Sequence, residues 1–389
     1  MANTNENAYF ISAPGMHHSL RKLLQNEEAV KEVFTLVTDF SMLHMPESPE
    51  DELKELIGRR IAELHLREHN RVSWTVMMDR GVFEAAVGLL LAWCTEVKFL
   101  AIRNIPRNIP LAMVNMVATA AVHARSESTI TLEKLEGINI HVSDEPLPHE
   151  YEGHLTTLYR AACLPAMRQI TFANTRLVLL PGQNILKKHP SSNLRSIRID
   201  DCIMSPVAMK WILTFFKDLQ CVDIAARMVP SSNVEVEKYT KYDNETLDSV
   251  LRHHSLSLTC LRLNLKSEAR YSLTGYISGI GSLHHMEKLR DLDVTWDLLE
   301  GVASESLLNM LPKNLEELRV AGQGGGEAMM REVESMSMSE AVTKGTLPKL
   351  RKVTVNKDLL LGYLQHSVEV VKQRFGDMGV ELRVLDSII

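Results

Sequence analysis

Residues that could support catalysis or hold a cofactor do not occur at the spacings such chemistry needs. The patterns GxxxxGK[ST], GxSxG and HExxH are all missing, so no phosphate loop, nucleophile elbow or zinc-protease helix is recognisable. The glycine-rich segment GQGGGE at 322–327 lacks the GxGxxG spacing of a dinucleotide site, which favours a loop insertion. We expect no catalytic residue and no enzyme activity; a hydrolase or transferase with an unrecognised site is the remote alternative.

Histidine and cysteine, the common ligands of transition metals, are also poorly arranged for binding. Histidines pair at 17–18, 253–254 and 284–285, but neighbouring helix residues point about 100° apart and do not form a two-ligand face. The chain has five widely spaced cysteines and no CxxC, which is typical of reduced thiols in an intracellular protein: Cys94, Cys163, Cys202, Cys221 and Cys260. We therefore expect no metal site, no cofactor and no disulfide framework.

Composition and charge describe an ordinary globular chain of 389 residues. It is 45% apolar and 24% charged, with a formal net charge of −6, so it lacks the basic balance of a nucleic-acid binder. The polar start MANTNENAYF shows no secretory signal, and the longest apolar run, 85–93, is too short to span a bilayer. We expect a cytoplasmic or nuclear protein that binds neither nucleic acid nor membrane.

One short pattern recurs along the chain: an apolar residue, two variable residues, then an apolar, a variable and an apolar residue. The last three positions alternate with period two, which predicts a strand whose apolar side chains point inward. The leading apolar residue is expected to lie on the turn into the strand, above the core. Clear copies occupy 194–199, 219–224, 258–263, 289–294, 315–320 and 350–355, and weaker ones 97–102, 135–140, 167–172 and 380–385.

Segments between these copies have the character of helices. Residues 205–218, 246–255 and 305–312 are examples, and Ser205 followed by Pro206 is a typical helix start. One strand-and-helix unit cannot bury both of its apolar faces, whereas stacked neighbours can. The sequence therefore predicts an α/β, leucine-rich-repeat-like solenoid, with a curved parallel sheet and helices on its outer side. Uneven spacing makes the array degenerate and implies insertions such as 226–245 and 322–346.

The first third of the chain differs from the rest. Residues 16–39 and 49–66 have the apolar spacing of amphipathic helices, and 82–93 is predicted to be a buried helix leading into the first strand. We expect residues 1–90 to form a helical cap and 91–389 to form the solenoid. The methionine-rich part of the second insertion is predicted to be loosely packed, or alternatively an adaptable binding surface: Met329, Met330, Met336 and Met338.

The outward-pointing residues of the strands are the candidate binding residues. In parallel strands that share one register they would form rows on the concave surface, where repeat proteins commonly bind. Arginines and aspartates alternate along one row, which favours cross-strand pairing or a patterned surface for a protein ligand, with simple solvation as the alternative. The candidates are Arg198, Asp200, Asp223, Arg262, Asn264, Asp293, Thr295 and Arg319, and further outward positions include Ala101, Asn139, Thr171 and Thr354.

Several segments in combination resemble the repeat region of the fungal F-box/leucine-rich-repeat proteins. The resemblance runs from about residue 17 to the end of the chain, and its most recognisable units are SNLRSIRIDDCIMSPVAMKWIL at 192–213 and IGSLHHMEKLRDLDVTWDLLEG at 280–301. Similar segments occupy 19–36, 85–102, 307–320 and 379–385. The resemblance implies the substrate-recognition part of a ubiquitin-ligase receptor, with a protein ligand and a ligase adaptor as partners.

One departure from that family keeps a second reading open. An F-box is a helical segment of the family that precedes the repeats, binds the ligase adaptor and opens with Leu-Pro and acidic residues. No such segment is visible before residue 17. The alternative is therefore a leucine-rich-repeat-like adaptor or scaffold without a link to ubiquitin.

Overall fold

The computed structural model describes residues 8–42, 44–45, 49–64, 66, 68–105, 132–143, 154–177, 193–229, 246–267, 279–300, 307–322, 326–338, 345–356 and 365–385. The chain divides into two compact units. Among the described residues, unit 1 comprises those up to Leu177 together with 193–194, and unit 2 begins at Arg195. The predicted boundary near residue 90 stays a prediction.

Parallel strands form the sheet of unit 1. They pair in chain order, β1 with β2, β2 with β3, β3 with β4 and β4 with β5. Their bounds are Ala8–Ser12 for β1, Thr35–Asp39 for β2, Phe99–Ile105 for β3, Gly137–Val142 for β4 and Gln169–Ala173 for β5, and the short β6 is Arg176–Leu177. The predicted strands at 97–102, 135–140 and 167–172 are confirmed.

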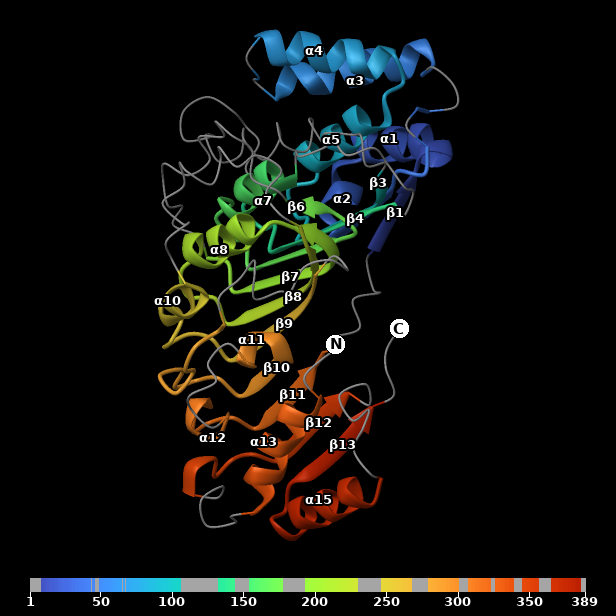
Figure 1. Ribbon diagram of the computed structural model, residues 1–389. Helices are drawn as coiled ribbons and strands as arrows, with labels where there is room; N and C mark the ends of the chain where they lie inside the picture. The colour runs from blue at the N-terminus through green and yellow to red at the C-terminus, as the bar shows by residue number, and fades with distance from the viewer. Residues whose placement is uncertain are drawn as a thin grey trace. The chain divides into compact units, whose positions relative to one another are not determined.

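Helices of unit 1 pack mainly near its N-terminal end, where α1 contacts α5 and α3 contacts α4 (Figure 1). The predicted helices at 49–66 and 82–93 are confirmed as α3 and α5. The prediction of one helix over 16–39 is wrong, because the chain there forms α1, α2 and then strand β2. The bounds are η1 Ala13–Gly15, α1 Met16–Gln25, α2 Glu27–Lys31, α3 Asp51–Glu63, α4 Glu68–Asp79, α5 Phe83–Trp93 and α7 His154–Ala162.

Unit 2 contains parallel strands that follow one another in chain order from β7 to β13 (Figure 1). Each pairs with the next through residue-by-residue register, except for one shift in β7 between Ile199 and Cys202. Every strand predicted for this part is confirmed. The bounds are β7 Ser196–Met204, β8 Cys221–Met228, β9 Cys260–Ser267, β10 Asp291–Thr295, β11 Glu317–Ala321, β12 Lys352–Asn356 and β13 Glu381–Leu385.

Helices connect these strands, and α8, α10 and α12 lie on the same side of them in Figure 1. Helix α8 begins as predicted, because the Ser205 hydroxyl accepts a hydrogen bond from the Ala208 backbone N–H at 3.2 Å and Pro206 follows. The bounds are α8 Pro206–Phe215, α10 Leu247–Arg252, α11 Trp296–Glu300, α12 Leu307–Met310, α13 Gly326–Met338 and α15 Gln365–Asp377.

The methionine-rich segment corrects one prediction. Residues 326–338 form helix α13, with Met329, Val333 and Met336 buried on one face at helical spacing, so this part is not a loose insertion. The side chains of Met330 and Met338 lie outside the described residues, as do 323–325 and 339–344 of the glycine-rich and following segments.

The core of unit 2 lies behind the apolar face of its sheet. Inward residues such as Ile197, Val222 and Leu261 have no exposed surface. The leading residue of each later repeat of unit 2 is buried as expected: Leu219, Leu258, Leu289, Leu315 and Leu350. Each unit is thus an α/β array of parallel strands, consistent with the predicted leucine-rich-repeat-like solenoid. None of the described helices is long and apolar enough to cross a membrane.

Candidate binding face

Polar side chains cover the face of the unit 2 sheet opposite to its core, here called the polar face. Strand residues alternate between the two faces, so the parallel register brings equivalent outward residues together across neighbouring strands. One such set, here called the charged row, is formed by Arg198, Asp223, Arg262, Asp293, Arg319, Thr354 and Arg383. Five of the eight predicted site residues lie in this row, as the sequence predicted.

A second set of outward residues lies two positions earlier on each strand and is here called the leading row. It consists of Ser196, Cys221, Cys260, Asp291, Glu317, Lys352 and Glu381. The sequence prediction missed its charged members, together with Arg383 of the charged row. The period-two pattern carried the necessary signal, because the residue before the first inward apolar position must also point outward.

Ion pairs link the charged row across the strands. Asp223 lies 4.0 Å from the Arg198 Nε and 3.7 Å from an Arg262 Nη, and Asp293 lies 3.6 Å from the Arg319 Nε. Arg262 also donates to Asp291 of the leading row. The cross-strand pairing that the alternating signs suggested is therefore present. These distances exceed those of good hydrogen bonds, except for the Arg262–Asp291 contact, so most pairs contribute through charge alone.

The three remaining predicted site residues lie outside the charged row and differ in their contacts. Asp200 lies two positions after Arg198, at the register shift of β7, so it is outside the charged row, and it pairs with Arg198 at 3.2 Å. Asn264 is half-buried and aligns with Ala225. Thr295 is only 6% exposed, and its hydroxyl accepts from the Leu265 backbone N–H at 2.9 Å. Thr295 thus holds β10 against β9, and because its hydroxyl is engaged with the β9 backbone it is a weak candidate for contact with a ligand.

Asp293 is the most buried charged group of the polar face. The residue is 6% exposed, and its Oδ1 has no hydrogen-bond partner among the described residues. Burial raises the pKa of this carboxyl to about 6, against the opposing effect of the Arg319 and Arg262 guanidinium groups. Burial likewise raises the pKa of Asp223, and the hydrogen bond to Asp291 raises the pKa of Arg262.

Replacing Asp293 with asparagine is expected to stabilise the protein increasingly as pH rises from about 4 to 7. A carboxyl whose folded-state pKa is raised holds its proton longer in the folded state, so it costs stability once pH passes the unfolded value. This pKa shift corresponds to an increase of at most about 3 kcal/mol in the free energy of unfolding of Asp293→Asn at neutral pH. Urea unfolding of both proteins across this range tests it, and a difference that does not depend on pH would contradict it.

Two thiols lie side by side in the leading row. Cys221 and Cys260 are register partners on β8 and β9, and both are half-buried. The Cys260 thiol hydrogen-bonds Cys221 and lowers its pKa, whereas the same contact raises the pKa of Cys260. One proton of this pair is therefore more acidic than that of an isolated thiol.

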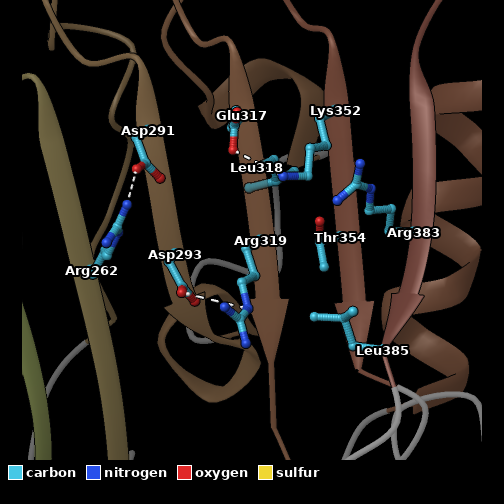
Figure 2. Close-up of a pocket in the computed structure, with 10 residues that line it drawn as sticks. All are labelled: Arg262, Asp291, Asp293, Glu317, Leu318, Arg319, Lys352, Thr354, Arg383 and Leu385. Atoms are coloured by element: carbon cyan, nitrogen blue, oxygen red, sulfur yellow. Dashed lines mark hydrogen bonds and ion pairs between the residues drawn. The ribbon is translucent and has the colours of Figure 1, made fainter. Parts of the chain in front are cut away.

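A hollow of about 270 Å³ opens on the polar face over β10 to β13. Figure 2 shows Thr354 between Arg319 and Arg383, with Leu385 beside them. Its lining comprises Arg262, Asp291, Asp293, Glu317, Leu318, Arg319, Lys352, Thr354, Arg383 and Leu385. Its lining carries four cationic side chains, three carboxylates and one hydroxyl, so the cationic donors outnumber the acids by one, which suits recognition of an anionic group. Across the part of the chain that the structure describes, no group of three or more His, Cys, Asp or Glu side chains is arranged to hold a metal ion.

Comparison with known proteins adds no relative to this picture. A scan against protein-family models gives no match, and a search of curated proteins gives no match either.

Proposed function

We propose that this chain is a protein-recognition module whose polar face binds another protein. The observation that carries the proposal is the charged row, in which arginines and acids from consecutive strands alternate in register on a half-exposed surface. Patterned charge of this kind selects one partner by complementarity and rejects others by repulsion. Parallel repeat arrays present such surfaces on rigid strands, which lowers the entropy lost on binding.

The resemblance to F-box/leucine-rich-repeat proteins extends the proposal to a role in the cytoplasm or nucleus. There the chain would act as the substrate-recognition part of a ubiquitin-ligase receptor. An adaptor or scaffold without a ubiquitin link uses the same face, and the identity of the co-purified proteins distinguishes the two. Both readings rest on analogy of architecture, which supplies a hypothesis about function and not a site.

A steric block on the polar face tests the proposal without removing any ion pair. Ala225 and Ala321 are half-exposed outward residues of β8 and β11. We expect Ala225→Arg combined with Ala321→Arg to abolish co-purification of the partner from cell lysate, because each new side chain projects from the sheet into the contact surface. Quantitative mass spectrometry of affinity-purified material measures this loss.

The matched control places the same side chain elsewhere in unit 2. Gln373 is exposed on helix α15, so Gln373→Arg should leave co-purification unchanged. Retention of every partner by the Ala225/Ala321 variant, with thermal unfolding like that of the wild type, would contradict the proposal. Recovery of a ligase adaptor with the wild type supports the ligase reading, and its absence among recovered partners supports the scaffold reading.

A further inference from the structure

The alternation of the charged row breaks at Thr354. Arg262 has Asp223 and Asp293 as its register neighbours on the two adjacent strands. Arg319 has Asp293 on one side but Thr354 on the other, and Arg383 follows Thr354 on β13. The position where the pattern would place an acid therefore holds a neutral hydroxyl between two arginines.

The groups around this position keep hydrogen-bond donors available. Arg319 approaches Asp293 through Nε at 3.6 Å, and Arg383 binds Glu381 through Nε at 2.6 Å. Within the described ranges, neither arginine uses its terminal Nη atoms in a hydrogen bond. Thr354 is only 5% exposed, and its hydroxyl makes no hydrogen bond within the same ranges. Two guanidinium groups and one hydroxyl can thus donate to a single acceptor placed over Thr354.

The size of the hollow limits what can occupy it. Its volume of about 270 Å³ lies just below the range of roughly 300–1,000 Å³ that is typical of pockets for small molecules. Leu385, which is half-buried, adds apolar surface to the otherwise polar lining, whereas Leu318 is 1% exposed and belongs to the core. These dimensions fit one side chain with an anionic end and an aliphatic stem, inserted from a longer polypeptide.

We propose that the hollow binds a glutamate or aspartate side chain in an acidic peptide segment of the partner protein. The proposal rests on the proposed function, and it specifies that the hollow is the part of the polar face that binds a carboxylate of the partner. The incoming carboxylate occupies the place of the missing acid: it accepts hydrogen bonds from Arg319, Arg383 and the Thr354 hydroxyl. Lys352 borders the same hollow and pairs with Glu317 at 3.3 Å.

Fluorescence anisotropy with a fluorescein-labelled oligoglutamate peptide and the full chain tests this binding. We expect saturable binding that weakens as salt rises, because the groups are partly exposed to solvent. Arg383→Gln and Thr354→Val should each weaken binding about tenfold, since each removes a donor to a charged acceptor. Thr354→Asp supplies the carboxylate from the protein itself and should abolish binding.

The control removes a positive charge at a distance from the hollow. Lys217 is exposed on the turn between α8 and β8, so Lys217→Gln should bind the peptide like the wild type. The Arg383 side chain is 52% exposed and pairs only with the equally exposed Glu381 among the described residues, so its replacement should cost little stability and keeps the test decisive even where a Thr354 variant unfolds. Equal weakening by Lys217→Gln and Arg383→Gln would overturn the proposal, because binding would then reflect overall charge.

Two further outcomes separate this inference from the proposed function. A phosphoserine peptide that binds where oligoglutamate does not would overturn the carboxylate assignment. Loss of the cellular partner in the Ala225/Ala321 variant, combined with no peptide binding by the wild type, would overturn this inference and leave the proposed function standing.

Discussion

Replacing Trp211 with alanine is expected to lower the free energy of unfolding by about 3–5 kcal/mol, the usual cost of removing a large buried aromatic side chain. Trp211 lies in α8 with no exposed surface. Its ring stacks on Phe215 at 4.7 Å between centroids and meets Phe216 edge-on at 6.1 Å. The alanine variant leaves a cavity beneath the sheet of unit 2, and denaturant unfolding measures the loss.

A second substitution separates packing from hydrogen bonding. The buried Trp211 Nε1 has no partner among the described residues, whereas the Trp74 Nε1 in unit 1 donates to the Ala85 carbonyl at 2.8 Å. Trp211→Phe should therefore cost clearly less than Trp74→Phe, because only the second change breaks a hydrogen bond. Equal costs for the two changes would contradict this account of the α8 core.

The strands of unit 2 could be predicted because each one repeats the same pattern of buried apolar residues. A leading leucine is buried on the turn, as Leu219 and Leu258 are, and two inward apolar residues follow with period two. Local alternation and the repeat spacing therefore specify both the strand and its inward face. The register follows, since a shift by one residue would expose every apolar side chain.

The first two strands were missed because their sequences lack this pattern. Strand β1 buries only Ile11 of its five residues, so it carries almost no alternating signal. Strand β2 follows α2 after a short turn, and its apolar residues Leu36 and Val37 extend the helical spacing of the preceding segment. Pairing with β3 places Leu36 beside Leu100, a tertiary contact that overrides the local periodicity.

The candidate face was predictable as a row, and its electrostatics were not. Period two and parallel register together bring Arg198, Asp223 and Arg262 into line. The burial of Asp293 depends on the side chains that surround it, and the hollow depends on the exposed ends of Arg319 and Arg383. Such properties arise from the packing of long side chains on neighbouring strands, which spacing in one sequence does not encode.

Reversing the charge of Arg262 is expected to destabilise the protein by about 2–4 kcal/mol, between the costs measured for exposed and for buried ion pairs. Arg262 contacts Asp291 and lies 3.7 Å from Asp223, with Asp293 as its register neighbour. Arg262→Glu therefore brings a fourth carboxylate among three, one of which is already buried. Urea unfolding near neutral pH measures the effect.

The pH dependence of this variant identifies repulsion as the cause. Neighbouring negative charge raises carboxyl pKa values in the folded state. The loss in free energy of unfolding caused by Arg262→Glu should therefore grow as pH rises, and it should shrink below about pH 6, where Asp293 holds its proton. The control, Arg290→Glu, reverses a side chain that is 67% exposed and lies 3.8 Å from Glu316, so it should cost under about 1 kcal/mol.

The same arrangement decides how the polar face should be probed. If Arg262→Glu costs no more than Arg290→Glu, the acids around Arg262 do not depend on it, and the charged row is a set of independent solvated residues. If the cost is as large as expected, loss of partner binding on charge reversal would report unfolding as much as recognition. Substitutions that add bulk at Ala225 and Ala321, or that remove an exposed charge at Arg383, avoid that ambiguity. None of them removes the cationic partner of a buried carboxylate.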